Sequence, residues 1–279
     1  KRALFLLLAS VALANAGVSF EPINVDYHGT VGIPLAAKLE QAELAQDFDG
    51  NRIIGGSQSA LGAHPHMAGL LVTLTSGGRS MCGATLLTNT RVVTAAHCWR
   101  TTRFQGRAIV VVLGSVNLFS GGTRLNTNTI QMHPNYNMNT LINDVAVIVI
   151  PWVSYTNTIR NVAMASGSNS FAGQNAVAAG FGLIADVNGN NERLRHVTLQ
   201  VITNAECARV FGTVSVIGST LCTSGAGGRN ICDGDSGGPL VLNRQLIGIT
   251  SFGARRCQAG LPSGFARVTS FNSWISARL

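Results

Sequence analysis

The sequence predicts an all-β fold, and its composition and its apolar pattern both indicate it. The 279 residues include 32 glycines and 7 prolines, and 46% are hydrophobic while only 11% are charged. These values exclude disordered, collagen-like and coiled-coil chains, and so many glycines and prolines predict many turns. Short apolar runs between Gly, Asn and Ser turns are typical of strands, and they lie at 67–74, 108–113, 176–179 and 239–242.

Two local patterns near the end of the chain add to this expectation. Asn243 and Arg244 fit the turn of a hairpin after the last of these runs. The apolar side chains at 268, 271, 274 and 275 recur with helical spacing, which predicts a closing C-terminal helix.

The first sixteen residues have the pattern of a secretory signal. Lys1 and Arg2 precede an apolar run at 3–14, and the small residues Ala14 and Ala16 stand where signal peptidase reads the chain. We expect cleavage after Ala16. A buried apolar helix is the alternative, whereas the run is too short to cross a bilayer.

Residues 17–52 differ in charge from the rest of the chain. They carry six of the twelve acids, only Lys38 and Arg52 as bases, and no cysteine. A short amphipathic helix is predicted over 35–45. Arg52 followed by the apolar and glycine residues at 53–56 is typical of an exposed cleavage site, although an ordinary turn would look the same.

The part from 53 to 279 is strongly basic in an unusual way. It has sixteen arginines, no lysine and six acids, a net charge of +10. Arginine keeps its proton in a medium near pH 10–11, where lysine loses much of its charge, so this surface suits an alkaline medium. Drift toward arginine codons is the alternative. Nucleic-acid binding is not predicted, because the arginines are scattered without interleaved aromatics.

All six cysteines lie downstream of residue 52. An even number in a secreted chain predicts three disulfides, with fifteen connectivities open by counting alone. Zinc is not favoured, because no Cys-x-x-Cys or paired histidine spacing occurs. The six acids in this part form no cluster of calcium ligands, so we expect no metal and no cofactor.

A glycine-rich loop holds the candidate nucleophile. In Gly234-Asp235-Ser236-Gly237-Gly238-Pro239 the serine is flanked so that a tight turn would expose its hydroxyl and direct N–H groups at one spot. His97 is the candidate base, because it ends a buried strand and precedes Cys98. The other histidines of this part fit surface or strand positions: His64, His66, His133 and His196.

Asp144 is the candidate carboxylate. It precedes the continuous apolar run 145–150, and an acid that enters a core needs partners or costs several kcal/mol. Donation from His97 Nδ1–H would supply one partner. Asp186 instead lies in a polar turn, and Asp233 belongs to the serine loop.

Together, Thr94-Ala95-Ala96-His97-Cys98, Asn143-Asp144 and the serine loop closely resemble the chymotrypsin-like serine proteases. In that family the catalytic residues follow one another in the order His, Asp, Ser along the chain. The resemblance covers nearly all of 53–279, and it is greatest to insect digestive chymotrypsins. The arginine-only part fits an enzyme of the alkaline midgut of moth or butterfly larvae.

The resemblance implies two six-stranded antiparallel barrels with a C-terminal helix, which divide near 155–170. His97 and Asp144 would come from the first barrel and Ser236 from the second, with the site between them. The implied disulfides are Cys82–Cys98, Cys207–Cys222 and Cys232–Cys257.

The resemblance also implies how the chain is activated and how it works. Cleavage after Arg52 would free the α-amino group of Ile53 to pair with Asp235, and the cut propeptide 17–52 would leave because no cysteine holds it. Ser236 would attack the substrate carbonyl with His97 as base, and N–H groups of Gly234 and Ser236 would hold the oxyanion.

Aligned from Ser236, the family resemblance also implies the position of the substrate pocket. Asn230 falls at its base, so a basic substrate side chain would meet no counter-charge. The remaining pocket positions are Ser251, Phe252, Gly253 and Ser263. The small residues at 253 and 263 leave room for a large apolar or aromatic side chain, whereas the amide of Asn230 departs from the family pattern.

The expected partners are protein or peptide substrates, an activating trypsin-like protease and protein protease inhibitors. We expect a secreted monomer that binds neither nucleic acid nor membrane. Two alternatives remain open: an immune-cascade protease of the same fold, and a non-catalytic homologue that acts as a binding protein. A chain with the whole triad and no cysteine-rich N-terminal module favours the digestive enzyme over both.

Overall fold

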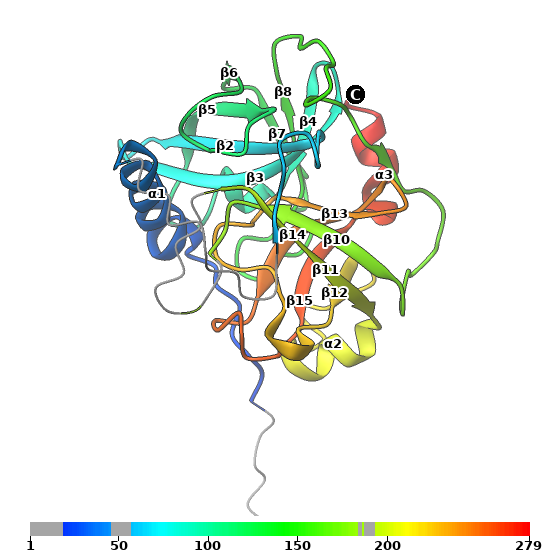
Figure 1. Cartoon of the computed structure of the whole chain (residues 1–279). Coiled ribbons are helices and arrows are strands. Elements are labelled where there is room, and N and C mark those ends of the chain that lie inside the picture. Colours follow the sequence, from blue (N-terminus) through cyan, green and yellow to red (C-terminus); the bar gives the residue numbers. More distant parts are fainter. Residues whose placement is uncertain (1–18, 46–56, 184–185, 187–192) are drawn as a thin grey trace, which may run out of the picture.

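Two antiparallel β-sheets form the body of the molecule (Figure 1). The computed structural model describes residues 19–45, 57–183, 186 and 193–279. The predicted signal at 1–16 and the predicted cleavage site at Arg52 and Ile53 lie outside the described residues. None of the helices in the described ranges is long and apolar enough to cross a membrane.

The first sheet has seven strands in the order β6-β5-β2-β3-β4-β8-β7. Its strands are β2 (Met67–Leu74), β3 (Arg79–Thr88), β4 (Arg91–Thr94), β5 (Gly106–Leu113), β6 (Thr123–Thr127), β7 (Ile130–Met132) and β8 (Ala146–Val149). The central strands are buried on both faces, which explains their nearly continuous apolar sequence.

The second sheet contains a closed ring of six strands, because β12 pairs with both β15 and β11. The ring strands are β10 (Asn175–Gly180), β11 (Arg195–Ile202), β12 (Thr220–Thr223), β13 (Pro239–Leu242), β14 (Gln245–Gly253) and β15 (Ser263–Arg267). Two short strands join it, β1 (Ser57–Gln58) on β11 and β9 (Ala163–Met164) in parallel with β14. The expected trypsin-like fold is confirmed, although only the second sheet closes into a six-stranded barrel; the first sheet has seven strands and forms an open half-barrel.

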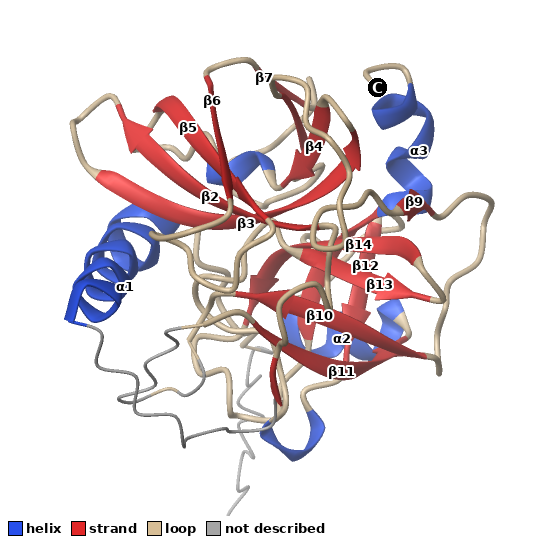
Figure 2. Cartoon of the chain, turned by 45° about the horizontal axis from the view of Figure 1, so that its top comes forward, coloured by secondary structure: helices blue, strands red, loops and turns tan. Residues whose placement is uncertain are grey.

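Helices cover the ends of the two sheets (Figure 2). Helix α2 (Asn204–Phe211) begins at Thr203 with a reciprocal capping box to Glu206. Helix α3 (Val268–Ser276) is the expected closing helix, and its Phe271 and Ile275 are buried in the core that fills the first sheet. The Asn243–Arg244 turn joins β13 to β14, with both residues at positive φ.

Residues 19–45 lie against the body of the molecule rather than apart from it. A short π-helical turn, His28–Gly32, leads into helix α1 (Ile33–Ala45), which runs beside β3 (Figures 1 and 2). Pro34 is tolerated in the first turn of α1, where backbone N–H groups have no intrahelical partner. The expected helix at 35–45 therefore forms, and it begins two residues earlier.

Candidate active site

A buried His–Asp pair lies at one side of the cleft between the sheets. His97 is in the turn Ala96–Cys98 after β4, and Asp144 precedes β8. The backbone N–H of His97 donates to Asp144 Oδ1 at 2.8 Å, and Nδ1 lies 2.7 Å from Oδ2. Because a carboxylate only accepts, Nδ1 carries the proton, and Nε2 of the neutral ring is left as a base.

Asp144 is 1% exposed, so its charge must be satisfied inside the protein. Besides the two bonds from His97, the hydroxyl of Ser251 donates to Oδ2 at 2.6 Å. The preceding residue, Asn143, has a φ of 58°, and its side chain donates to Asn135 O at 2.9 Å. Asparagine tolerates this left-handed conformation, which turns the chain so that the acid enters the core.

Ser236 stands in a tight turn before β13. Gly237 has a φ of 80°, and a Cβ there would overlap the hydroxyl of Thr94, so the turn requires glycine. Ser236 O accepts from Gly83 N at 2.7 Å, which fixes the turn against the first sheet. Ser236 and His97 line the same cleft, so the structure brings the candidate nucleophile and base to one surface.

The candidate oxyanion donors lie in the same turn. Asp235 N donates to Cys232 O at 3.0 Å, and Gly237 N donates to Thr250 O at 2.8 Å. The N–H groups of Gly234 and Ser236, on either side of Asp235, make no hydrogen bond to another residue that the structure describes. Gly234 has a φ of 99°, a conformation that glycine alone adopts readily.

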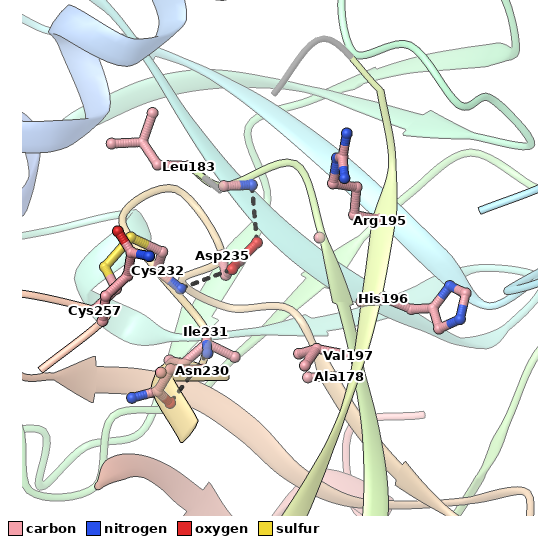
Figure 3. Close-up of a pocket in the computed structure, with 15 residues that line it drawn as sticks. Ala178, Leu183, Arg195, His196, Val197, Asn230, Ile231, Cys232, Asp235 and Cys257 are labelled. Atoms are coloured by element: carbon pink, nitrogen blue, oxygen red, sulfur yellow. Dashed lines mark hydrogen bonds between the residues drawn. A yellow bond between two sulfur atoms is a disulfide. The ribbon is translucent and has the colours of Figure 1, made fainter. Parts of the chain in front are cut away.

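Asp235 lies half-buried behind the serine turn. Its Oδ1 accepts from Gly182 N at 2.8 Å, and its Oδ2 accepts from Cys232 N at 2.9 Å (Figure 3). Burial raises the pKa of Asp235 to about 6; the two backbone hydrogen bonds lower it, and the charge of Asp233 raises it. A carboxylate held this way favours a nearby cation, and it lines a pocket of its own beside the cleft.

The predicted substrate-pocket residues are divided between two hollows. Ser251, Phe252 and Gly253 line the cleft together with His97 and Ser236. Asn230 instead lines the neighbouring pocket with Asp235. Ser263 pairs with Gly253 across β14 and β15, and its hydroxyl donates to Asn230 Oδ1 at 2.7 Å.

Asn230 is held firmly in this position. Its Nδ2 donates to Leu261 O at 2.9 Å, and its Oδ1 also accepts from Ile231 N at 3.1 Å. Phe252 packs edge-on against Phe211 of helix α2, with ring centroids 5.2 Å apart. The ring of Phe252 also lies over Gly264, where a Cβ would overlap it. The aromatic residue at 252 therefore fills the wall behind the cleft.

Three disulfides stabilise the loops around the cleft, and every described cysteine is paired. Cys82 on β3 is bonded to Cys98, directly after His97. The other two bonds, Cys207–Cys222 and Cys232–Cys257, join α2 to β12 and brace the serine turn. These are the pairs that the family resemblance implies, and two of them anchor residues adjacent to the candidate chemistry.

Sequence reasoning missed two residues that lie at this site. Tyr27 and His28, upstream of α1, are buried, and the ring of Tyr27 packs edge-on against His97 with centroids 4.9 Å apart. The Tyr27 hydroxyl donates to Met81 O at 2.8 Å. Burial raises the pKa of Tyr27, and a hydrogen bond with the Ser236 side chain opposes that rise. An aromatic pair within an acidic segment was the signal available in the sequence.

Comparison with known proteins places the chain in a family. The trypsin family model matches residues 53–275. The chain belongs to the trypsin family. It is thus a serine endopeptidase by family, and the matched residues contain His97, Asp144 and Ser236.

Several similar proteins come from arthropods. A collagenase of Hypoderma lineatum is 37% identical over 230 residues, 80% of this chain and 86% of that protein. Alkaline trypsin C of Manduca sexta is 36% identical over 81% of this chain and 90% of its own length. Brachyurin of Leptuca pugilator is 35% identical over 81% and 98%. The solved structure of HL collagenase superposes with a TM-score of 0.75 at 36% identity, covering 81% of this chain and 98% of that one.

Proposed function

We propose that this trypsin-family chain is the secreted precursor of a digestive endopeptidase in which Ser236, His97 and Asp144 perform the chemistry. One observation carries the assignment of these residues. His97 is held by Asp144 through two hydrogen bonds and faces the cleft that Ser236 also lines. That arrangement leaves the imidazole as a base at the place where a serine hydroxyl must lose its proton.

The proposed reaction proceeds through an acyl-enzyme. Ser236 Oγ attacks the peptide carbonyl while His97 Nε2 takes its proton and then passes it to the leaving amine. Asp144 stabilises the imidazolium that forms. The N–H groups of Gly234 and Ser236, which bond to no other residue in the described ranges, would receive the oxyanion, and the loss of one such donor costs about 10²–10³ in rate. Water then releases the acyl group by the reverse sequence.

Activation by cleavage after Arg52 is part of the proposal. The new α-amino group of Ile53 would pair with Asp235, whose burial and raised pKa make a cationic partner favourable. An α-amino group titrates near pH 8 in water, so pairing must raise its pKa for the enzyme to work in an alkaline medium. The stabilisation is full below the unpaired pKa and is lost as pH rises through the paired pKa.

The proposed specificity is for large apolar or aromatic side chains. Asn230 carries no charge to meet lysine or arginine, and Gly253 and Ser263 leave the pocket walls small. The amide of Asn230 is already bonded to Leu261 and Ser263, so its own polar atoms are satisfied. Relatives named as trypsins make basic substrates the competing outcome of the test.

An alkaline gut lumen is the proposed location. The arginine-only charge of 53–279 keeps the domain positive at high pH. A similar protein of Manduca sexta is named an alkaline trypsin, which agrees with such a medium.

The experiment is cleavage of the full chain by a trypsin-like protease, followed by labelling with a fluorophosphonate. Labelling of the cleaved wild type and none of Ser236→Ala is expected. Anilide substrates with Phe, Tyr, Leu, Met and Arg then rank the specificity. If the cleaved chain takes no label and hydrolyses none of them, it is a binding homologue and the proposal is wrong.

A further inference from the structure

The N-terminal segment occupies the cleft of the precursor. We propose, on the basis of the proposed function, that residues 19–45 are an inhibitor of the mature protease. They would block its cleft before cleavage and, once released, bind it again as a competitive inhibitor. This assigns the segment a function beyond holding the chain inactive until Arg52 is cut. Several independent contacts in the described residues carry the inference.

Tyr27 is the centre of the contact. It packs against His97 with ring centroids 4.9 Å apart and donates to Met81 O at 2.8 Å. The same cleft is lined by Ser236 and by further residues of the segment, namely Pro22, Ile23, Asn24, Thr30 and Val31. A substrate must reach Ser236 and His97, so Tyr27 and a bound substrate exclude each other.

His28 and Gly32 fix the segment against β3. Nδ1 of His28 lies 2.8 Å from the hydroxyl of Ser80, and both side chains are fully buried. Gly32 approaches Ser80 so closely that a Cβ at residue 32 would overlap the hydroxyl. This close backbone approach requires glycine, because the hydroxyl is already positioned by its bond to His28.

Helix α1 seals the edge of the site with its apolar face. Leu35, Ala36 and Leu39 are buried in one cluster with Met81 and Phe181 of the body. Leu35 lies over the serine turn, where a Cβ added to Gly234 would overlap it. Because apolar side chains leave water when they bind here, this face supplies a driving force that does not depend on the covalent link at Arg52.

Charge complementarity supports the same pairing. Glu40 forms an ion pair with Arg79 at 2.8 Å, and Asp26 forms one with Arg103 at 2.7 Å. Glu43 accepts from three groups of one loop: Leu118 N at 2.7 Å, Phe119 N at 2.9 Å and Ser120 Oγ at 2.8 Å. An acidic segment thus matches a domain with sixteen arginines, which speeds association at low salt.

The contact differs from that of a substrate. The residues next to Tyr27 form a helical turn, His28–Gly32, that continues into α1. A peptide substrate must be extended to add its backbone as a strand beside β14. The helical backbone that follows Tyr27 cannot pair in that way, so this part of the segment does not bind as a substrate strand.

The test uses the full chain, cleaved after Arg52 and separated from its N-terminal segment by gel filtration at 1 M salt. A synthetic peptide of residues 19–45 is then added back to the active enzyme. We expect competitive inhibition, in which KM for an anilide substrate rises while kcat stays constant. Peptide Tyr27→Ala should have an inhibition constant at least tenfold higher, and Gly32→Ala should be weakened similarly. Peptide Lys38→Ala, changed on the exposed side of α1, should match the wild type within twofold.

The outcomes separate the two proposals. If the stripped enzyme neither hydrolyses substrate nor takes fluorophosphonate, the proposed function fails and inhibition cannot be scored as support. If the stripped enzyme is active and the peptide does not inhibit it at 100-fold molar excess, the inhibitor proposal is overturned. Rapid hydrolysis of the added peptide within residues 19–45, followed by mass spectrometry, would also overturn it, because the segment would then be a substrate.

Discussion

The hydroxyl of Ser251 donates to Oδ2 of Asp144 at 2.6 Å, and the same oxygen receives Nδ1–H of His97. Ser251 belongs to β14 of the second sheet, whereas Asp144 precedes β8 of the first. The carboxylate is therefore held from both sides of the cleft. Its orientation toward His97 depends on the packing of the two sheets against each other.

Replacing Ser251 by alanine should lower kcat. A hydrogen bond to a charged group contributes about 1.5–3 kcal/mol, so its loss predicts a decrease of about 10-fold to 100-fold in kcat. The Michaelis constant should change little for substrates that do not contact the hydroxyl. Steady-state kinetics of the cleaved enzyme measures this, with Ser168→Ala on an exposed loop as the control. An unchanged kcat would show that His97 alone orients Asp144.

Replacing Asp144 by asparagine should leave the fold intact and nearly abolish turnover. The amide would donate toward His97 and favour the tautomer with its proton on Nε2, where a base is needed. In the chymotrypsin family the same exchange lowers kcat by about 10⁴. The acylation rate in a single turnover, compared between the wild type and Asp144→Asn, measures this loss. Retention of most of the wild-type rate would contradict the assigned role of Asp144.

Asp235 should make the uncleaved precursor less stable as pH rises. Its pKa is raised from 3.8 to about 6 by burial, so the folded chain binds more protons than the unfolded chain between these values. The stability that Asp235 contributes is therefore full below pH 4. It is lost as pH rises through 6, which lowers the free energy of unfolding by about 3 kcal/mol in total. Urea unfolding at pH 4 to 8 measures the free energy of unfolding for the wild type and for Asp235→Asn, and the slopes of this free energy against pH are compared.

The Asp235→Asn precursor should lack this part of the pH dependence. After cleavage at Arg52 it should also stay inactive, because the amide offers Ile53 no charge. Identical slopes in the two precursors, or full activity of the cleaved variant, would contradict the assignment.

Inhibition by the N-terminal segment should weaken in acid. Burial, followed by the charge of His97, lowers the pKa of His28 from 6.5 to about 3, so a proton favours the free peptide. The ionisable side chains nearest to His28 are those of His97 and Tyr27. Binding contributed by His28 is full above pH 6.5, and it should fall about 30-fold between pH 8 and pH 5. Fluorescence anisotropy of a labelled peptide measures this.

Peptide His28→Gln separates this effect from any pH dependence of the enzyme. It should retain only the pH dependence that the enzyme itself contributes. Equal pH profiles for the two peptides would show that His28 is not the group responsible.

The complex should also weaken above pH 10. Burial, with the charges of Asp233 and Asp235, raises the pKa of Tyr27, so its ionisation favours release. Affinity should fall between pH 9 and pH 11 for the wild-type peptide and remain nearly flat for Tyr27→Phe. A strongly alkaline medium would then promote release of the segment after cleavage. Parallel curves for both peptides would assign the alkaline effect to another group.

Much of the fold and the candidate chemistry follows from local sequence. Alternating and continuous apolar runs between turn residues predict strands, and this pattern extends over only a few residues. The isolation of Asp144 before an apolar run, and of Ser236 among glycines, marks both residues without knowledge of their neighbours. The helical spacing after residue 268 likewise predicts α3 from one face of one element.

The tertiary structure alone decided which distant groups meet. Ser251 lies 107 positions from Asp144, and no local pattern records that its hydroxyl reaches the carboxylate. Asn230 likewise bonds to Leu261 and Ser263, which lie 31 and 33 positions further along the chain. Tyr27 reaches His97 because α1 buries its apolar face on β3 and carries the preceding residues with it. Such contacts depend on packing between elements, because burial rewards any complementary surface however far apart its residues lie in the sequence.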